Sequence, residues 1–308
     1  MPTVSVIIPN YNHASFLKQR INSVLHQTFQ DFEIIILDDC STDNSKEIIE
    51  DYRLYPKVKH ITYNKANSSS TFKQWEKGIN LATGELIWIA ESDDVVEPTF
   101  LEKLVTLAAQ NSNIVLAYCA TEFIDEKGKS LGLNNWAAAL DPVRWQNVYI
   151  NDGKDEIEQF LHYRNTIPNA SAVIFQKKSA LFIYQLVKKK MKFAGDWIFW
   201  VSVLAHGKIA YTNEVLNYQR DHQQTSRSHM GIALEIKRVK EYIQSIQTTA
   251  KIAHIRIDWR SPKYDWIFQQ CSLNIPYSKK TLLVFWYKTL SLNFLSRLFK
   301  KYRIKNRV

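Results

Sequence analysis

The stretch Val4-Ser-Val-Ile-Ile-Pro-Asn-Tyr-Asn12 decides the fold, because a short β-branched run ends at a proline and is followed at once by polar and aromatic residues. A second run, Glu33–Leu37, contains three consecutive isoleucines and leads directly into Asp38 and Asp39. Continuous apolar strands of this kind indicate burial on both faces, as in a parallel sheet. Each run therefore predicts a central strand with polar groups at its carboxyl end.

Strand and helix signals alternate over the first hundred residues. The predicted strands are Val4–Pro9, Glu33–Leu37, Val58–Tyr63 and Glu85–Ala90, and the predicted helices are Phe16–Thr28, Ser41–Leu54, Thr71–Ala82 and Pro98–Gln110. This alternation predicts an α/β fold: a Rossmann-like, mixed but mostly parallel open sheet flanked by helices.

Beyond residue 111 strand and helix signals no longer alternate regularly. Further strands are expected at Ile114–Cys119, Ala170–Phe175 and Lys208–Tyr211, and helices at Trp197–Ala205, Ser228–Ala253 and Ser278–Val308. No motif is recognisable in residues 120–170. We therefore expect a second, less regular part and a C-terminal helical extension.

The charge of the chain is unevenly distributed. Its 308 residues carry a net charge of +10, with 45% hydrophobic residues. Residues 279–308 hold nine Lys or Arg and no Asp or Glu, whereas residues 1–100 hold 9 basic against 14 acidic residues. A protein that wraps a polyanion would be basic throughout. We therefore expect no nucleic-acid partner.

Other classes are also excluded by composition. The three cysteines, Cys40, Cys119 and Cys271, have no paired spacing, which argues against a disulfide scaffold or zinc ribbon and favours a reducing compartment. No secretory signal is visible, and no run of about eighteen apolar residues predicts a transmembrane helix. We expect a cytoplasmic protein.

Three predicted strands end in side chains that suit a nucleotide and a metal. Asn10–Asn12 follow the first strand, Asp38 and Asp39 the second, and Glu91–Asp94 the fourth. Ligands of open α/β sheets bind beyond the carboxyl ends of the strands, and closely spaced carboxylates bind hard cations. Since the sequence has no glycine-rich phosphate loop, a metal and side chains such as Lys73 or His222 would have to neutralise the charge of a diphosphate.

Three stretches in this order resemble the family 2 glycosyltransferases of GT-A fold: Val4–Asn12, Asp38–Asp43, and Ala82–Glu85 leading to Glu91–Asp94. The resemblance covers roughly residues 3 to 222. It implies transfer of a sugar from a nucleotide-diphosphate donor with inversion at the anomeric carbon. It also implies a requirement for Mg²⁺ or Mn²⁺.

The resemblance also implies roles for individual residues. Asp93 is the expected direct metal ligand, with Glu91 and His222 as further metal candidates. The expected nucleotide-binding residues are Pro9, Tyr11, Asn12, Asp39, Lys73 and Ser92. The remaining histidines have no comparable context, and we interpret them as structural or exposed.

Asp196 is the expected catalytic base. Gly195-Asp196-Trp197 opens an apolar helix at the place where the family carries an acidic residue. An acceptor hydroxyl must lose its proton as it attacks, and a positioned carboxylate can take that proton. The competing interpretation is that Asp196 only caps the helix.

The expected organisation has three parts. Residues 1–110 form the nucleotide-sugar-binding half of the GT-A domain, residues 111–227 the acceptor-binding half, and residues 228–308 a helical extension. The basic, amphipathic end of that extension is typical of helices that lie on anionic membranes. We expect peripheral contact with the inner face of the cell membrane, the alternative being a tail that packs on the core.

The expected function is transfer of a sugar, with UDP as the first choice of nucleotide, to a hydroxyl of a glycan or lipid-linked saccharide in cell-surface polysaccharide synthesis. The sequence leaves two alternatives open: a sugar nucleotidyltransferase, and a catalytically inactive GT-A binding subunit.

Overall fold

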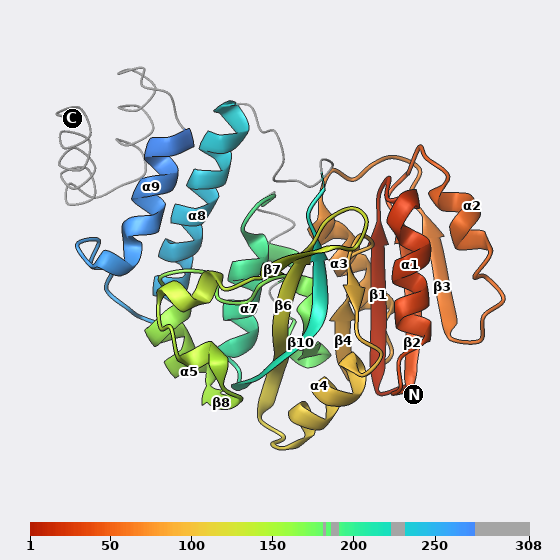
Figure 1. Ribbon diagram of the computed structural model, residues 1–308, viewed down its shortest axis with the longest axis horizontal. Coiled ribbons are helices and arrows are strands. Elements are labelled where there is room, and N and C mark those ends of the chain that lie inside the picture. The colour runs from red at the N-terminus through yellow and green to blue at the C-terminus, as the bar shows by residue number, and fades with distance from the viewer. Residues whose placement is uncertain (181–182, 186–190, 223–231, 275–308) are drawn as a thin grey trace.

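A ten-stranded mixed sheet runs through the molecule and carries helices on both faces (Figure 1). The computed structural model describes residues 1–180, 183–185, 191–222 and 232–274. The strand order is β3-β2-β1-β4-β9-β6-β10-β5, with β7 paired to β6 and β8 to β10. The expected α/β class, with an open sheet between helical layers, is confirmed.

The strands have the following bounds. They are β1 (Val4–Asn10), β2 (Phe32–Asp38), β3 (Val58–Tyr63), β4 (Leu86–Ile89), β5 (Val95–Val96), β6 (Ile114–Ile124), β7 (Ser130–Leu133), β8 (Tyr149–Asp152), β9 (Val173–Gln176) and β10 (Lys208–Arg220).

The principal helices are α1 (Ala14–Leu25), α2 (Ser45–Glu50), α3 (Thr71–Leu81), α4 (Phe100–Ala109), α5 (Gly153–Glu156), α7 (Gly195–Leu204), α8 (Ile232–Ile252) and α9 (Asp265–Asn274). Short helical turns lie at Trp136–Ala139, Arg144–Gln146, Ile157–Leu161, Ala170–Ala172, Lys177–Ser179 and Pro262–Tyr264.

Two parallel groups of strands meet at β9. Strands β3, β2, β1 and β4 are parallel, and so are β6 and β10, while β9 runs antiparallel to both β4 and β6. Strand β1 pairs with β2 on one side and β4 on the other, so their carboxyl ends meet at one edge. An edge of this kind is where open α/β sheets bind ligands.

Alternate residues of the central strands supply two separate cores. Ile7, Ile35 and Ile87 face the layer that contains α3 and α7. Val6 and Ile34 face the layer that contains α1 and α4. Because every residue of β1 and β2 is buried, the sequence shows continuous apolar runs instead of alternation.

The structure corrects several predicted boundaries. The helix predicted to reach Leu54 ends at Glu50. Strand β10, predicted only to Tyr211, continues to Arg220. Its register against β6 shifts between Thr212 and Val215, where exposed polar residues interrupt the apolar pattern. A bulge of this kind allows the strand to continue past residues that end a strand signal.

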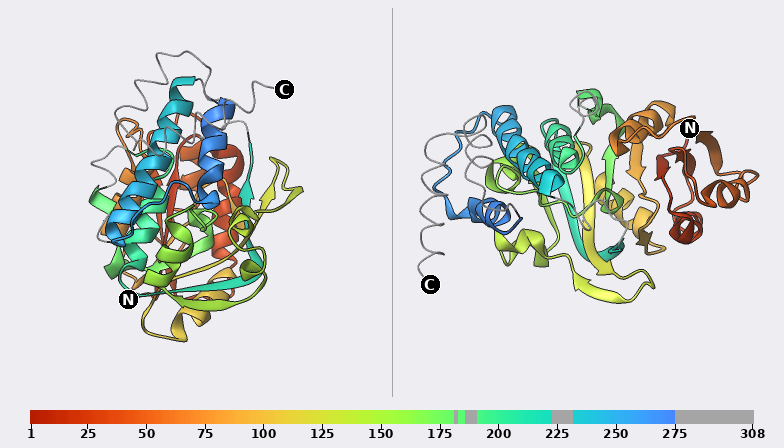
Figure 2. Two further views of the ribbon diagram at one scale, coloured as in Figure 1. Left: turned by 90° about the vertical axis from the view of Figure 1, so that its left-hand side faces the viewer. Right: turned by 90° about the horizontal axis from the view of Figure 1, so that it is seen from above.

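The two C-terminal helices pack on the α/β core. Helices α8 and α9 lie side by side, at the opposite end of the molecule from α2 and β3 (Figures 1 and 2). Val239, Ile243 and Ile246 of α8 are buried in the same core as α7. Within the described ranges, no helix is long and apolar enough to cross a bilayer. The predicted helix Ser278–Val308 lies outside the described residues.

His162 provides a test of this packing. It is buried, its Nδ1 lies 3.1 Å from the Ile157 carbonyl oxygen, and its ring contacts Tyr264 just before α9. Burial lowers the pKa of His162 to about 4. The unfolded chain, but not the folded protein, takes up a proton here as the pH falls from about 6.5 to about 4, so stability should fall by roughly 2–3 kcal/mol over that window. Urea unfolding measured at several pH values checks this.

Replacement His162→Gln should flatten the acid slope, because the titrating group is gone. The same replacement at exposed His206 is the matched control and should keep the wild-type slope. An acid slope in His162→Gln equal to that of the wild type would contradict the assignment.

Candidate functional site

Two buried arginines hold the acidic turn that follows β4. Arg20 of α1 donates from Nε to the Glu91 carbonyl oxygen at 2.7 Å. Arg220, the last residue of β10, donates from Nε to the Asp93 carbonyl oxygen at 2.9 Å, and its backbone N–H donates to Asp94 Oδ1 at 3.0 Å. Burial lowers the pKa of Arg20 to about 10, so its guanidinium stays charged at neutral pH. The turn is therefore fixed from both sides by positive charge.

The three acids of this turn differ in charge. Burial, together with the nearby Asp93, raises the pKa of Glu91 to about 8 and that of Asp94 to about 7. Burial acts to raise the pKa of Asp93 too, but the hydrogen bond from His222 and the nearby His13 outweigh it and lower this pKa. Asp93 is consequently the carboxylate that remains ionised at neutral pH.

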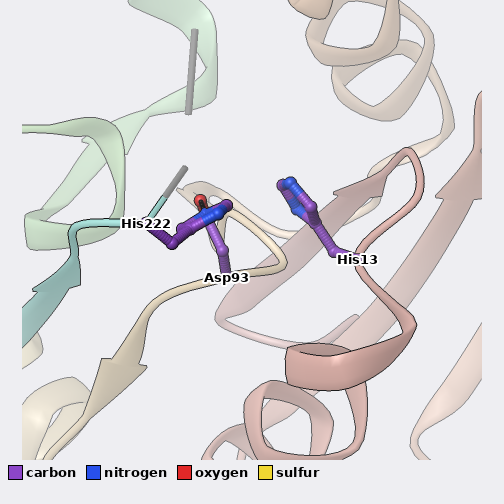
Figure 3. A group of neighbouring side chains, drawn as sticks. All are labelled: His13, Asp93 and His222. Atoms are coloured by element: carbon purple, nitrogen blue, oxygen red, sulfur yellow. Dashed lines mark hydrogen bonds and ion pairs between the residues drawn. The ribbon is translucent and has the colours of Figure 1, made fainter. Parts of the chain in front are cut away.

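Asp93 and His222 lie together with a third potential metal ligand, His13 (Figure 3). Asp93 Oδ2 is 3.0 Å from His222 Nε2, and one ligand atom from each of the three residues lies within 4.8 Å of the others. Glu91, which the sequence places among the metal candidates, is outside this group and accepts a hydrogen bond from Trp75 Nε1 at 3.0 Å. Oxygen and imidazole ligands suit a divalent cation.

His13 is the functional candidate that sequence reasoning missed. The sequence predicts a structural or exposed residue here, yet His13 is half-buried and lies at the start of α1, one residue after Asn12. Burial lowers its pKa, which keeps the imidazole neutral and able to bind a metal. Its position directly after the first strand-end motif was the available signal.

Several of the predicted nucleotide-binding residues lie where β1 and β2 end. Asp39 is buried, and it accepts hydrogen bonds from Asn64 Nδ2 at 2.6 Å and from the Ser68 backbone N–H at 2.9 Å. Lys73 Nζ donates to the Ser68 carbonyl oxygen at 3.3 Å. Tyr11 is 45% exposed and offers a ring at the same edge. The structure thus brings Asp39, Lys73 and Tyr11 to one side of the sheet.

The other predicted nucleotide residues have structural contacts. Pro9 is buried in β1 opposite Leu37. Asn12 has a positive φ of 56°, and its Oδ1 accepts from the Thr42 backbone N–H at 2.7 Å. Ser92 Oγ lies 2.8 Å from His13 Nδ1. Asn12 therefore shapes the turn after β2, and Ser92 lies against the metal group.

Asp196 lies in the first turn of α7. The N-cap residue of this helix is Ala194, with no side-chain cap, so Asp196 is not the capping residue. Its Oδ2 accepts from Asn165 Nδ2 at 3.1 Å. The segment that leads into α7 is held by the carboxylate of Glu241 in α8, which accepts backbone N–H groups of Lys192, Phe193 and Ala194 at 3.0, 2.6 and 3.2 Å.

Asp196 lines a cavity of about 660 Å³ that is rich in aromatic rings. Its aromatic rings come from β6, the helical turns at residues 136–139 and 144–146, α7 and the segment before it, β10, α8 and α9. They are Tyr118, Phe123, Trp136, Trp145, Phe193, Trp197, Tyr211, Tyr242 and Trp266. Sequence analysis found no motif here, because the rings are scattered over the chain and only the fold gathers them. Flat aromatic faces beside a carboxylate suit the apolar face and hydroxyls of a sugar ring.

One loop connects the cavity to the acidic turn. Asn165 donates to Asp196, and four residues later Asn169 Nδ2 donates to Asp94 Oδ2 at 2.7 Å. Asn217 of β10 in turn donates to Asn169 Oδ1 at 3.0 Å. The loop at residues 165–169 therefore joins the candidate base to the turn that carries Asp93.

The mixed sheet between helical layers has the architecture of the GT-A glycosyltransferases. The family model "Glycosyl transferase family 2" matches residues 5–179, more than half of the chain, and the protein belongs to this family. Of the two enzyme classes that the sequence left open, the match is to the glycosyltransferases.

Relatives agree with this assignment. An uncharacterized glycosyltransferase of Nostoc sp. is 27% identical over 279 residues, which are 85% of this chain and 82% of the relative. The putative teichuronic acid biosynthesis glycosyltransferase TuaG of Bacillus subtilis is 27% identical over 216 residues, 70% of this chain and 77% of TuaG.

Solved structures support the fold. S. aureus TarS 1–349 in complex with UDP gives a TM-score of 0.58 at 16% identity, covering 87% of this chain and 69% of that one. The mannosyltransferase PcManGT from Pyrobaculum calidifontis, in complex with GDP-Man and Mn²⁺, gives a TM-score of 0.50 at 14% identity. The match covers 92% of this chain and 79% of that one.

The contact of Glu241 with the start of α7 predicts a positioning role. Replacement Glu241→Gln leaves only one amide oxygen for three backbone N–H groups, so we expect a loss of about 1–3 kcal/mol in stability. We also expect a fall in turnover without loss of nucleotide affinity, because Asp196 loses its support. Urea unfolding and nucleotide titration check both. The matched control is Glu47→Gln on the exposed side of α2, and equal effects in the two variants would refute the role.

Proposed function

We propose that this glycosyltransferase moves a sugar, with inversion, from a UDP-sugar to a hydroxyl of a glycan or lipid-linked saccharide in cell-surface polysaccharide synthesis. The main observation in support is the place of Asp196, which lies in an aromatic cavity and is joined by one loop to the turn that bears Asp93. A base in the acceptor cavity, connected to the donor edge, is what direct displacement requires.

In this proposal Asp196 accepts the proton of the acceptor hydroxyl while that oxygen bonds to the anomeric carbon. The bond from that carbon to the diphosphate breaks on the opposite face, which inverts the configuration. The aromatic rings around Asp196 hold the acceptor sugar and keep water from competing.

Asp93 and His222 are the proposed holders of a Mg²⁺ or Mn²⁺ ion, and Asp39, Tyr11 and Lys73 the proposed nucleotide contacts. Their chemistry fits: an ionised carboxylate lies 3.0 Å from an imidazole nitrogen. When bound, such an ion supplies positive charge against the departing diphosphate. The likeness to TuaG, a putative teichuronic acid biosynthesis glycosyltransferase, and to TarS, whose structure was solved with UDP, supports the choice of pathway and donor.

Replacement Asp196→Asn tests the catalytic role. The amide cannot accept the proton, so the rate of transfer should fall by about 10²–10⁴-fold. UDP affinity, measured by isothermal titration calorimetry, should stay within about twofold, because the side chain lies in the acceptor cavity.

The matched control is Asp155→Asn, which removes an exposed carboxylate and should transfer at the wild-type rate. Released UDP across a panel of UDP-sugars and oligosaccharides is the measurement. Wild-type turnover by Asp196→Asn rules this residue out as the base.

We further propose that residues 279–308 hold the enzyme at the inner face of the cell membrane. Nine basic and no acidic residues suit anionic lipid, which attracts each such charge by about 1 kcal/mol near the surface. Deletion of these residues should abolish co-sedimentation with vesicles of mixed anionic and neutral lipid. Vesicles of neutral lipid alone are the control, and undiminished binding of the truncated protein would refute the proposal.

A further inference from the structure

Three separated segments converge at the proposed metal position. His13 stands at the start of α1, Asp93 in the turn between β4 and β5, and His222 just beyond β10 (Figure 3). His222 is buried, while Asp93 and His13 are each partly accessible, so the group opens toward solvent at the sheet edge. An opening of this kind leaves room for donor oxygens.

The spacing of two of these ligand atoms already matches an octahedral metal site. In such a site, with bonds of about 2.1 Å, adjacent ligand atoms lie about 3 Å apart. Asp93 Oδ2 and His222 Nε2 are 3.0 Å apart. One ligand atom of His13 lies within 4.8 Å of both.

The orientation of His13 is set by its neighbours. Its Nδ1 is 2.8 Å from Oγ of buried Ser92, which leaves Nε2 for a metal. Metal-binding histidines commonly use the second ring nitrogen for a hydrogen bond in this way. The His13 and His222 rings meet edge to face with centroids 5.4 Å apart, and Phe16 packs against both.

We propose that His13 is a third protein ligand of the cation and that Ser92 orients it. The site then has two imidazoles and one carboxylate, with three open positions for diphosphate and water. This inference rests on the proposed metal-dependent transfer and deepens it. Imidazole suits first-row transition ions, whereas Mg²⁺ prefers oxygen ligands and retained water. The site should therefore prefer Mn²⁺ to Mg²⁺.

The test is Mn²⁺ binding by electron paramagnetic resonance, with the full-length protein and saturating UDP. Wild-type protein should show electron spin-echo couplings from two imidazole nitrogens. His13→Ala should show one, with Mn²⁺ affinity lower by about 10–100-fold and Mg²⁺ affinity within about threefold. His13→Asp keeps a ligand and should shift the preference toward Mg²⁺.

Controls and contrary outcomes separate this inference from the proposed function. His206→Ala removes an exposed imidazole and should bind Mn²⁺ like the wild type, and circular dichroism checks that each variant folds. A single nitrogen coupling in the wild type, or unchanged Mn²⁺ affinity in His13→Ala, overturns the assignment of His13 and leaves transfer through Asp93 and His222 standing. Wild-type protein that binds no Mn²⁺ with UDP overturns both.

Discussion

The buried contact between two arginines and the acidic turn after β4 is the interaction on which the site depends. Asp94 is buried beside two further acids, and a buried carboxylate in such a place needs compensating positive charge. Arg20 and Arg220 supply it while donating to backbone carbonyls of the turn, so they fix its path as well as its charge. Because one arginine comes from α1 and the other from the end of β10, the same contact joins the first helix to the last strand.

The aromatic cavity depends on parts of the chain that lie far from the recognisable motifs in the sequence. Tyr242 of α8 and Trp266 of α9 line it, and Glu241 of α8 holds the segment before Asp196. The loop at residues 165–169 then ties the proposed base to the acidic turn. The acidic turn and the aromatic cavity are therefore parts of one hydrogen-bonded unit, and the C-terminal helices belong to it.

The sequence predicted the first half of the fold well because its strands are buried on both faces. The predicted strand was shorter than β10, because a bulge after Thr212 interrupts the apolar pattern of the strand. Asp93 and His222 were predicted as metal candidates from the family resemblance, and the structure places them together. His13 was not predicted, because a single histidine forms no recognisable pattern. The aromatic cavity was also missed, because side chains from distant segments meet only in three dimensions.

The meeting of His13 with His222 has a consequence for biosynthesis. These rings are in contact, yet more than two hundred residues separate them in the chain. Contacts of such long range form late, and domains fold as their chains leave the ribosome. A growing polypeptide can pair β1, β2 and β3 early, but the His13–Asp93–His222 group cannot exist until β10 has been made and added to the sheet. Stalled or truncated chains that end before β10 would thus lack this group.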